Sequence, residues 1–493
     1  MRVFSIHLVI GCALAISCLA GCSVPARNER RPRIVVPGPQ RPRNEPRPSA
    51  WPSATWWRSF RDPTLDALIQ RAFGSQPTLR IAQARVALAR GAAVAAGAPL
   101  RPAVVGSGGV SRKGISSGAL VPAPLAGKTV NYGSLALALE YDFDFWGRNH
   151  ALLRAAQDEV AVADAEDAGA RLILATAVTA TYFDLRYALE QSDLADQTVD
   201  RRGRILSLVS DRERIGLDQL AAVRQAEAEV ASARVLAIQA RNRTRILRDA
   251  LAALTGQAPD ATASLGQPLA HALPALQLPQ LVPADLIGRR PDLAALRKQV
   301  SAATERTRAA KADFFPNINL ASFLGLEHHD LPELLEGASR TWGVGLALDL
   351  PIFDGGVRRG HLEVRRSQAD IAIEEYNSLL LQAIQQAADA IASYQSAGSA
   401  LVPAQQAVQA TRSAYELILA RYRRGLVSYI DVLTVENALL ARQSTLVRIL
   451  AQQTTSAVAL IKALGGGYTG EGVVRAAPTA RRIDPNRGLE VFS

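Results

Sequence analysis

Alternating apolar and polar positions mark four segments of the chain as β-strands. In the segment 341–352 (TWGVGLALDLPI), every second residue from Trp342 to Ile352 is apolar, and small or polar residues fill most of the positions between. Segment 131–143 alternates in the same way, 317–326 more loosely and 103–112 weakly. A length of roughly 10–12 residues suits a tilted strand that crosses a bilayer with one apolar and one polar face. A soluble, half-buried sheet is the alternative for these segments taken alone.

Long helices are predicted between and after these strands. No proline interrupts residues 146–207, and alanine recurs throughout them, which predicts one helix of about 60 residues and about 90 Å. Outside a bilayer, a helix of that length is typical of coiled coils. The matching helix of the second half contains Gly398 and Pro403, which predict a bend. Gly216 and Gly425 stand where the long helices turn back, and both are expected at positive φ.

A period near 210 residues relates the two halves of the chain. Pro77 begins a helical segment 25 residues before Pro102, and Pro291 does the same 25 residues before Pro316. A helix readily begins at proline, whose missing N–H costs nothing in the first turn. Because the period is too long for a solenoid repeat, it predicts two copies of one large unit. Further matches at nearly constant offset are Phe143-Asp144 with Phe353-Asp354, Gly216 with Gly425, and Gly256 with Gly466.

The repeat and the composition of its flanks divide the chain into six segments. Within each copy the predicted order is helix, strand, loop, strand, long helix, turn, long helix. The predicted segments are a signal peptide (1–21), a lipidated Pro/Arg-rich tether (22–54), repeat 1 (55–256), an equatorial linker (257–288), repeat 2 (289–467) and a C-terminal tail (468–493).

The number of strands sets the expected assembly. Four strands cannot close a barrel, and open strand edges in lipid would leave backbone groups unpaired at several kcal/mol each. If the strands span a membrane, the chain must therefore oligomerise, and a homotrimer supplies twelve strands. The expected fold is an α+β membrane protein, with a trimeric 12-stranded β-barrel and long coiled-coil helices; the family resemblance described below implies that these helices form a long α-helical barrel continuous with the β-barrel.

The N-terminus predicts export and lipidation. An apolar run, 8–20, follows Arg2 and ends in Leu19-Ala20-Gly21-Cys22, which resembles a bacterial lipoprotein box. Diacylglyceryl attachment to Cys22, followed by cleavage before it, would remove the other two cysteines. Disulfides, cysteine catalysis and cysteine metal sites would then be excluded. An ordinary secreted chain cut nearby is the alternative.

The net charge of +11 comes from 56 Lys and Arg against 45 Asp and Glu. Part of it lies between Ser23 and Ala54, a Pro- and Arg-rich stretch that favours an extended tether near anionic headgroups. A solvated spacer or a partner-binding motif would also account for this stretch. Nucleic acid is excluded as a partner because an exported lipoprotein does not meet it. The 5% aromatic content, with abundant alanine, fits long helices packed in thin layers.

No enzyme chemistry, metal or cofactor is predicted. His328-His329-Asp330 falls in the loop between two predicted strands, where a solvated loop is favoured over a metal site. The run Gly465-Gly466-Gly467 lacks the Lys-Ser/Thr of a phosphate-binding loop. No serine lies on a nucleophile elbow.

From about Trp56 to Gly466 the chain resembles the TolC-like outer-membrane factor superfamily, in its NodT/OprM-type lipoprotein branch. Gln76-Pro77 stands where that family usually has Asn-Pro-Asp, and the tether is longer than is common. The motifs that carry the resemblance are Trp56-Trp57 with Phe60, Asp62-Pro63 and Leu65; Tyr141-Asp142-Phe143-Asp144-Phe145-Trp146-Gly147-Arg148; Arg289-Arg290-Pro291-Asp292-Leu293; Asp313-Phe314-Phe315-Pro316; Leu350-Pro351-Ile352-Phe353-Asp354-Gly355-Gly356; and Arg421-Tyr422 with Gly425-Leu426-Val427-Ser428-Tyr429-Ile430-Asp431-Val432-Leu433.

The resemblance implies a trimer whose β-barrel crosses the outer membrane and whose helical barrel extends through the periplasm. Such a trimer is the passive exit duct of a tripartite efflux system, driven by an inner-membrane RND-type pump and opened at its periplasmic tip by an adaptor protein. Ser23, rather than Asp, follows the lipidated Cys22, and this favours the outer membrane by resemblance to sorted lipoproteins. Two other hypotheses are a type I protein secretion channel and a periplasmic lipoprotein without a pore.

The resemblance also assigns roles near the helical turns. Asp431 matches a carboxylate ring across the pore, and Tyr422 matches a residue that ties neighbouring helices in the closed state. Thr434 stands at the family's second acidic position, so a doubled ring is not expected. Four charged residues near this tip are candidates for interchain pairs or for a solvated turn: Asp211, Arg214, Glu416 and Arg424. The expected adaptor contacts are Gly216, Leu217, Gly425, Leu426 and Val427.

Overall fold

The chain forms two compact units in the computed structural model, which describes residues 32–34, 52–118, 126–262, 265 and 289–470. The predicted signal peptide and Cys22 lie outside the described residues, as do most of the tether, of the linker 257–288 and of the C-terminal tail. Unit 1 comprises Met1–Val35, Ala84–Ala163 and Ala295–Ser378, and unit 2 comprises Val36–Gln83, Asp164–Ala294 and Leu379–Ser493.

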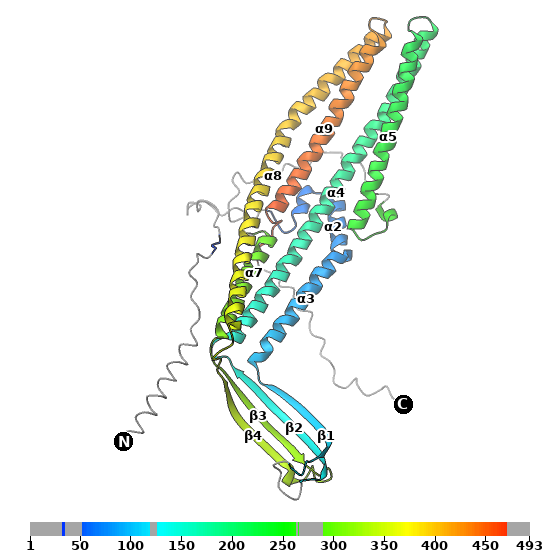
Figure 1. Ribbon diagram of the computed structural model, residues 1–493. Coiled ribbons are helices and arrows are strands. Elements are labelled where there is room, and N and C mark those ends of the chain that lie inside the picture. The colour runs from blue at the N-terminus through cyan, green and yellow to red at the C-terminus, as the bar shows by residue number, and fades with distance from the viewer. Residues whose placement is uncertain (1–31, 35–51, 119–125, 263–264, 266–288, 471–493) are drawn as a thin grey trace, which may run out of the picture. The chain divides into compact units, whose positions relative to one another are not determined.

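Unit 1 contains a four-stranded antiparallel sheet in the order β1-β2-β3-β4 (Figure 1). In its register, Leu135 of β2 lies opposite Gly108 of β1 and Leu326 of β3, and Trp342 of β4 lies opposite Leu324 of β3. Within the described residues, β1 and β4 each pair with one neighbour, so the sheet has two open edges. The strands are β1 (Ala103–Gly114), β2 (Thr129–Phe143), β3 (Asn317–His328) and β4 (Arg340–Asp349).

The predicted alternation holds along β4 but ends earlier than expected. Its apolar side chains Trp342, Val344, Leu346 and Leu348 are between 66% and 73% exposed. The sequence pattern also placed Leu350 and Ile352 in this strand, whereas the structure ends the strand at Asp349. Pro351 explains the difference, because proline cannot donate to a strand ladder.

The shorter helices begin largely as predicted. Helix α3 (Pro77–Gly97) and helix α7 (Pro291–Ala312) both start at the expected prolines. Helix α2 (Pro63–Ser75) was not predicted as a separate element, and Asp62 caps it by accepting hydrogen bonds from the first-turn amides. Short 3-10 helices are η1 (Trp56–Phe60), η2 (Ala98–Leu100), η3 (Pro259–Thr262) and η4 (Gly337–Ser339).

Four long helices form two antiparallel hairpins. The first long helix continues past its predicted end at Ser207, and the third runs without a break past Gly398 and Pro403. None of the helices in the described part of the chain is both long and apolar enough to span a membrane. The long helices are α4 (Arg148–Arg214), α5 (Leu220–Leu254), α8 (Val357–Arg423) and α9 (Tyr429–Ala463).

Helices α5 and α9 end in the same glycine cap. At each end, the amide of the first glycine donates to the carbonyl three residues earlier, and the next amide donates to the carbonyl five residues earlier. The glycines that take positive φ in these caps are Gly256 (66°) and Gly465 (82°). The sequence comparison matched Gly256 with Gly466 instead, and it was wrong by one position within a run of three glycines.

The largest buried cluster lies in unit 2, where η1 and α2 pack against α4. The Phe60 and Phe183 ring centroids are 5.0 Å apart. The Asp62 carboxylate accepts hydrogen bonds of 2.7 Å from the Tyr182 hydroxyl and from Arg186 Nη1. The aromatic motif at Trp56–Phe60 therefore has a packing role, because it fixes η1 and the start of α2 to α4.

Candidate functional site

The turns that join α4 to α5 and α8 to α9 have the same geometry, and both belong to unit 2 (Figure 1). Gly216 and Gly425 each have a φ of 77°, as predicted. Leu217 N donates to the Arg212 carbonyl at 2.8 Å, and Leu426 N donates to the Arg421 carbonyl at 3.0 Å. These are Schellman motifs, which satisfy the last carbonyls of a helix and need a residue that tolerates positive φ. The two tips are thus rigidly defined turns.

A buried polar cluster lies behind the first turn and joins the two hairpins. The Tyr422 side chain of α8 is fully buried, and its hydroxyl donates to Asp218 Oδ2 in the α4–α5 turn. Arg212 Nε lies 2.8 Å from the same carboxylate oxygen, and its guanidinium lies 4.7 Å from the centre of the Tyr422 ring. Burial, followed by the neighbouring Asp218 carboxylate, raises the pKa of Tyr422 above its ordinary value, so the hydroxyl stays protonated as a donor.

Sequence analysis identified Tyr422 but missed Arg212 and Asp218. The hydrogen-bond partners Tyr422 and Asp218 are 204 positions apart in the chain. No local pattern reports a contact over that distance. The repeat gives no help either, because Val427 occupies the position of Asp218 in the second turn.

Asp431 has a local structural role that the sequence did not reveal. Its Oδ2 accepts hydrogen bonds from the Ser428 hydroxyl at 2.7 Å and from the Ser428 amide at 2.8 Å, which forms a capping box at the start of α9. The Ser428 hydroxyl, followed by the Ser428 amide, lowers the pKa of Asp431. Asp431 is exposed and ionised at neutral pH. Thr434, one turn later, is also exposed, and its hydroxyl donates to the Ile430 carbonyl at 2.8 Å.

The other predicted charged residues do not gather into one site within the chain. Asp211 pairs with Arg214 of its own helix at 3.1 Å, and both side chains are exposed. Glu416 and Arg424 are exposed and make no ion pair with any residue that the structure describes. The prediction that these residues pair between chains is not tested by a single chain.

The expected adaptor-contact residues form an exposed apolar edge on the two turns. Leu217 is 59% exposed and Leu426 is 69% exposed, although both are large apolar side chains. Val427 is half-buried and packs against the cluster that contains Tyr422 and Tyr429. Of the predicted contact set, the two leucines therefore offer the most accessible apolar surface.

The histidine pair lies at the end of β3, because this strand runs to His328 and only His329 and Asp330 fall in the predicted loop. His328 Nδ1 accepts a hydrogen bond of 2.9 Å from the Asp330 amide, and the rings of His328 and His329 stack with centroids 4.5 Å apart. Within the described part of the chain, no group of three or more His, Cys, Asp or Glu residues is arranged to hold a metal ion.

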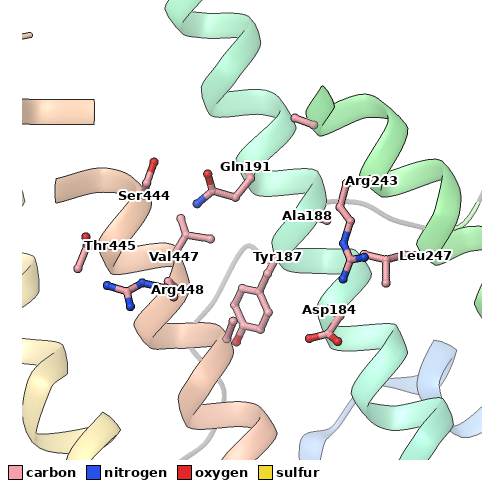
Figure 2. A pocket seen from close by; sticks show the side chains of 12 residues that line it. Asp184, Tyr187, Ala188, Gln191, Arg243, Leu247, Ser444, Thr445, Val447 and Arg448 are labelled. Carbon is pink, nitrogen blue, oxygen red and sulfur yellow. The ribbon is translucent and has the colours of Figure 1, made fainter. Parts of the chain in front are cut away.

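A groove of about 490 Å³ lies between α4, α5 and α9 in unit 2 (Figure 2). Ala188, Leu247 and Val447 supply apolar lining, and Arg243 of α5 approaches Asp184 of α4. Burial raises the pKa of Asp184, and the Arg243 charge opposes that shift. None of the residues that the sequence singled out lines this groove.

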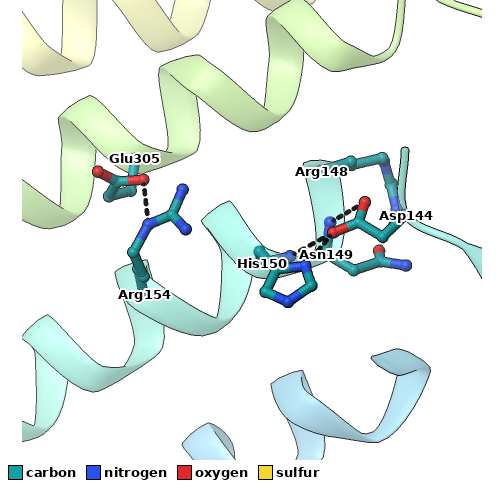
Figure 3. Close-up of polar contacts among 6 residues, drawn as sticks. All are labelled: Asp144, Arg148, Asn149, His150, Arg154 and Glu305. Carbon is teal, nitrogen blue, oxygen red and sulfur yellow. Dashed lines mark hydrogen bonds and ion pairs between the residues drawn. The ribbon is translucent and has the colours of Figure 1, made fainter. Parts of the chain in front are cut away.

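The link from strand β2 to helix α4 is fixed by a capping aspartate in unit 1 (Figure 3). The Asp144 carboxylate accepts hydrogen bonds from the amides of Asn149 (3.0 Å) and His150 (2.8 Å). Further along α4, Arg154 Nε donates to Glu305 Oε2 of α7 at 2.9 Å. Asp354 caps α8 in a similar way through the amides of Gly356 and Arg358. The matched Phe-Asp motifs therefore start the two long helices.

Comparisons with known proteins agree with this architecture. One relative is the multidrug resistance outer membrane protein MdtP of Escherichia coli, which is 30% identical over 86% of this chain and 89% of MdtP. Another is the toluene efflux pump outer membrane protein TtgF of Pseudomonas putida, which is 31% identical over 91% of this chain and 95% of TtgF. Among solved structures, the outer membrane protein VceC of Vibrio cholerae matches with a TM-score of 0.80 and 33% identity, over 85% of this chain and all of VceC. The open state of the MtrE outer membrane channel of Neisseria gonorrhoeae matches with a TM-score of 0.75 and 25% identity, over 90% of this chain and 98% of MtrE.

The family model for outer membrane efflux proteins matches residues 68–257 and 282–466, which include the long helices, all four strands and both turns. This span takes in most of the region in which the sequence motifs were found. The chain therefore belongs to the outer membrane efflux protein family.

Proposed function

We propose that this chain is the outer-membrane duct of a tripartite efflux system, through which drugs or other small molecules leave the cell. It turns over no substrate, because solute passes down a concentration difference that an inner-membrane RND-type pump maintains. Membership of the outer membrane efflux protein family supports this function, as do the names of the relatives MdtP and TtgF. The sheet has two open edges, and an apolar row is exposed along one of them, which supports a barrel assembled from several copies in a membrane.

The duct is a homotrimer. A sheet of four strands leaves unpaired backbone groups along β1 and β4, which are expensive in lipid. Pairing of β4 of one copy with β1 of the next removes both edges, and three copies close a 12-stranded barrel in the outer membrane. The exposed Trp342, Val344, Leu346 and Leu348 then face lipid.

Internal duplication gives this ring a pseudo-sixfold helical part in the periplasm. Helices α4 and α8 both have 67 residues, and α5 and α9 both have 35. Each helix of the second hairpin begins 209 positions after its counterpart in the first. Equal lengths and identical Schellman turns support two copies of one unit, with bounds 55–256 and 289–467.

The turns form the periplasmic gate. The Tyr422–Asp218–Arg212 cluster holds α8 against the α4–α5 turn in the closed state. Three copies of Asp431 near the axis place like charges together, which repel one another and attract cations. Within each chain, the hydrogen bonds from Ser428 lower the pKa of Asp431 and favour its ionised form. An adaptor that covers the exposed Leu217 and Leu426 biases the turns toward the open arrangement.

The lipid anchor is Cys22, acylated in the outer membrane. A Cys22→Ala variant is expected to lose incorporation of labelled palmitate, while a Ser23→Ala variant keeps it. Continued labelling of the Cys22→Ala chain would contradict the anchor without touching the channel.

Reconstitution in planar bilayers tests the channel itself. The purified chain is expected to run as a trimer in mild detergent and to form channels that conduct ions. Divalent cations added on the side of the helical turns should block this conductance. Asp431→Ala is expected to raise the conductance or abolish the block, whereas Thr434→Ala, which changes an uncharged neighbour, leaves both unchanged. A monomeric protein without any conductance would instead favour a structural lipoprotein.

A further inference from the structure

A second buried polar cluster joins α4, α5 and α9 away from the turns. Arg202 lies ten residues before Arg212 in α4, about 15 Å along the helix axis. Its side chain is 8% exposed, and its Nη1 lies 2.6 Å from Glu229 Oε2 of α5 and also donates to the Glu229 carbonyl at 3.1 Å. Its Nη2 donates to Asn437 Oδ1 of α9 at 2.6 Å. One guanidinium thus bonds to both hairpins.

The partner of this cation on α9 is incompletely bonded. The Glu436 side chain is only 2% exposed, and its Oε2 lies 3.8 Å from Arg202 Nε, beyond hydrogen-bond distance. Neither Arg202 Nε nor Glu436 Oε1 has a hydrogen-bond partner within the described residues. Burial raises the pKa of Glu436, and the charges of Arg202 and Arg201 oppose that shift. Buried groups of this kind are costly unless they are paired.

Two further unpaired polar atoms adjoin the cluster from α4 and α8. Arg201 Nη1 and the Tyr415 hydroxyl are buried without a hydrogen-bond partner in the described structure. The Arg201 guanidinium lies 5.7 Å from the centre of the Tyr415 ring. Burial, followed by the charge of Glu436, raises the pKa of Tyr415. All four long helices therefore contribute polar atoms here, and the present packing leaves several of them unsatisfied.

We propose that Arg202 and Glu436 form a second latch between the hairpins, which holds α9 to α4 while the duct is closed and exchanges partners when the helices shift. This inference rests on the proposed channel function. A buried polar network specifies one packing only when all its members are bonded. Here a small shift of α9 changes which donors reach Glu436, so a second arrangement of the same helices is available. The cluster at Tyr422 ties the tips, and the cluster at Arg202 ties the helix bodies.

Conservative variants in planar bilayers test this latch. Glu436→Gln removes the only charge that α9 presents to Arg202 but keeps its shape, and Arg202→Lys keeps the charge but cannot reach three acceptors at once. Each variant is expected to raise the open probability at fixed voltage at least threefold. The double variant should open no more than the stronger single variant, because both changes break one interaction. Arg241→Lys is the matched control, because Arg241 of α5 forms an exposed pair with Asp196 of α4, within one hairpin, and the change should leave gating unchanged.

The outcomes separate the latch from the channel function. Two outcomes would overturn the latch, provided that Tyr422→Phe still opens the duct. One is a wild-type open probability in both Glu436→Gln and Arg202→Lys. The other is a double variant whose open probability rises by the product of the two single effects. If the wild-type chain and Tyr422→Phe both fail to conduct, the channel function and the latch fail together. If Arg202→Lys does not assemble, Glu436→Gln alone decides, since an isosteric amide is the milder change.

Discussion

At the residue scale, the hydroxyl of Tyr422 makes a hydrogen bond that the hydroxyl of Tyr415 lacks. Both tyrosines are buried on α8, but only Tyr422 donates to a carboxylate, and the Tyr415 hydroxyl has no partner in the described structure. Tyr422→Phe is therefore expected to lower the free energy of unfolding by about 1.5–3 kcal/mol, the range for hydrogen bonds to charged groups. Tyr415→Phe should be close to neutral. Urea unfolding of the detergent-solubilised protein measures both, and equal losses would contradict the assignment.

The capping box at Ser428 makes the start of α9 sensitive to acid. Hydrogen bonds from Ser428 hold the pKa of Asp431 below its ordinary value of 3.8. A carboxylate with a lowered folded-state pKa contributes stability above its unfolded pKa and loses it as the pH falls through the folded value. The protection of the first-turn amides of α9, measured relative to their intrinsic exchange rate at each pH, should therefore fall below about pH 4. In Asp431→Asn the first turn should exchange faster at neutral pH and show no such step. An identical pH profile in both proteins would exclude the capping role.

At the scale of elements, the glycine turns set the register of each hairpin. Gly216 adopts a φ of 77°, where an alanine side chain costs about 1–2 kcal/mol. Gly203, in the interior of α4, has an ordinary helical φ and open space where the methyl group of an alanine would stand. Gly216→Ala is thus expected to lower the thermal midpoint, whereas Gly203→Ala should raise it slightly because alanine favours helix. Thermal unfolding, monitored by circular dichroism, measures the direction of both midpoint shifts. A shift in the same direction for both variants would count against the turn geometry.

At the scale of the whole molecule, the two faces of β4 are expected to differ sharply in their tolerance of charge. Leu346 belongs to the exposed apolar row, and Ala347 is its neighbour on the other face. Lysine on a lipid-facing position near the bilayer centre costs about 2–4 kcal/mol. Leu346→Lys should therefore lower the yield of trimer in the outer-membrane fraction, and Ala347→Lys should not. Equal yields from both variants would argue against a lipid-facing row.

Periodic features were predictable from the sequence, and contacts between distant segments were not. The alternation around Trp342, the helix starts at Pro77 and Pro291, and the positive φ of Gly216 follow from local stereochemistry, so the pattern alone predicts them. The Arg212 and Asp218 cluster and the Arg202 network depend on which helices meet, and their partners are separated by up to 235 positions in the chain. The capping box at Ser428 is local, since Ser428 and Asp431 are three residues apart, and this spacing could have been recognised from the sequence.

The open edges of the sheet also have a genetic consequence. If each closed barrel needs strands from three copies, every copy in a ring depends on the other two. When a cell makes equal amounts of wild-type and Leu346→Lys chains, random mixing leaves about one eighth of the rings free of variant chains. A single defective allele should therefore act dominantly over the intact one. The fraction of channel activity that remains in such a cell then reports how many chains form each ring.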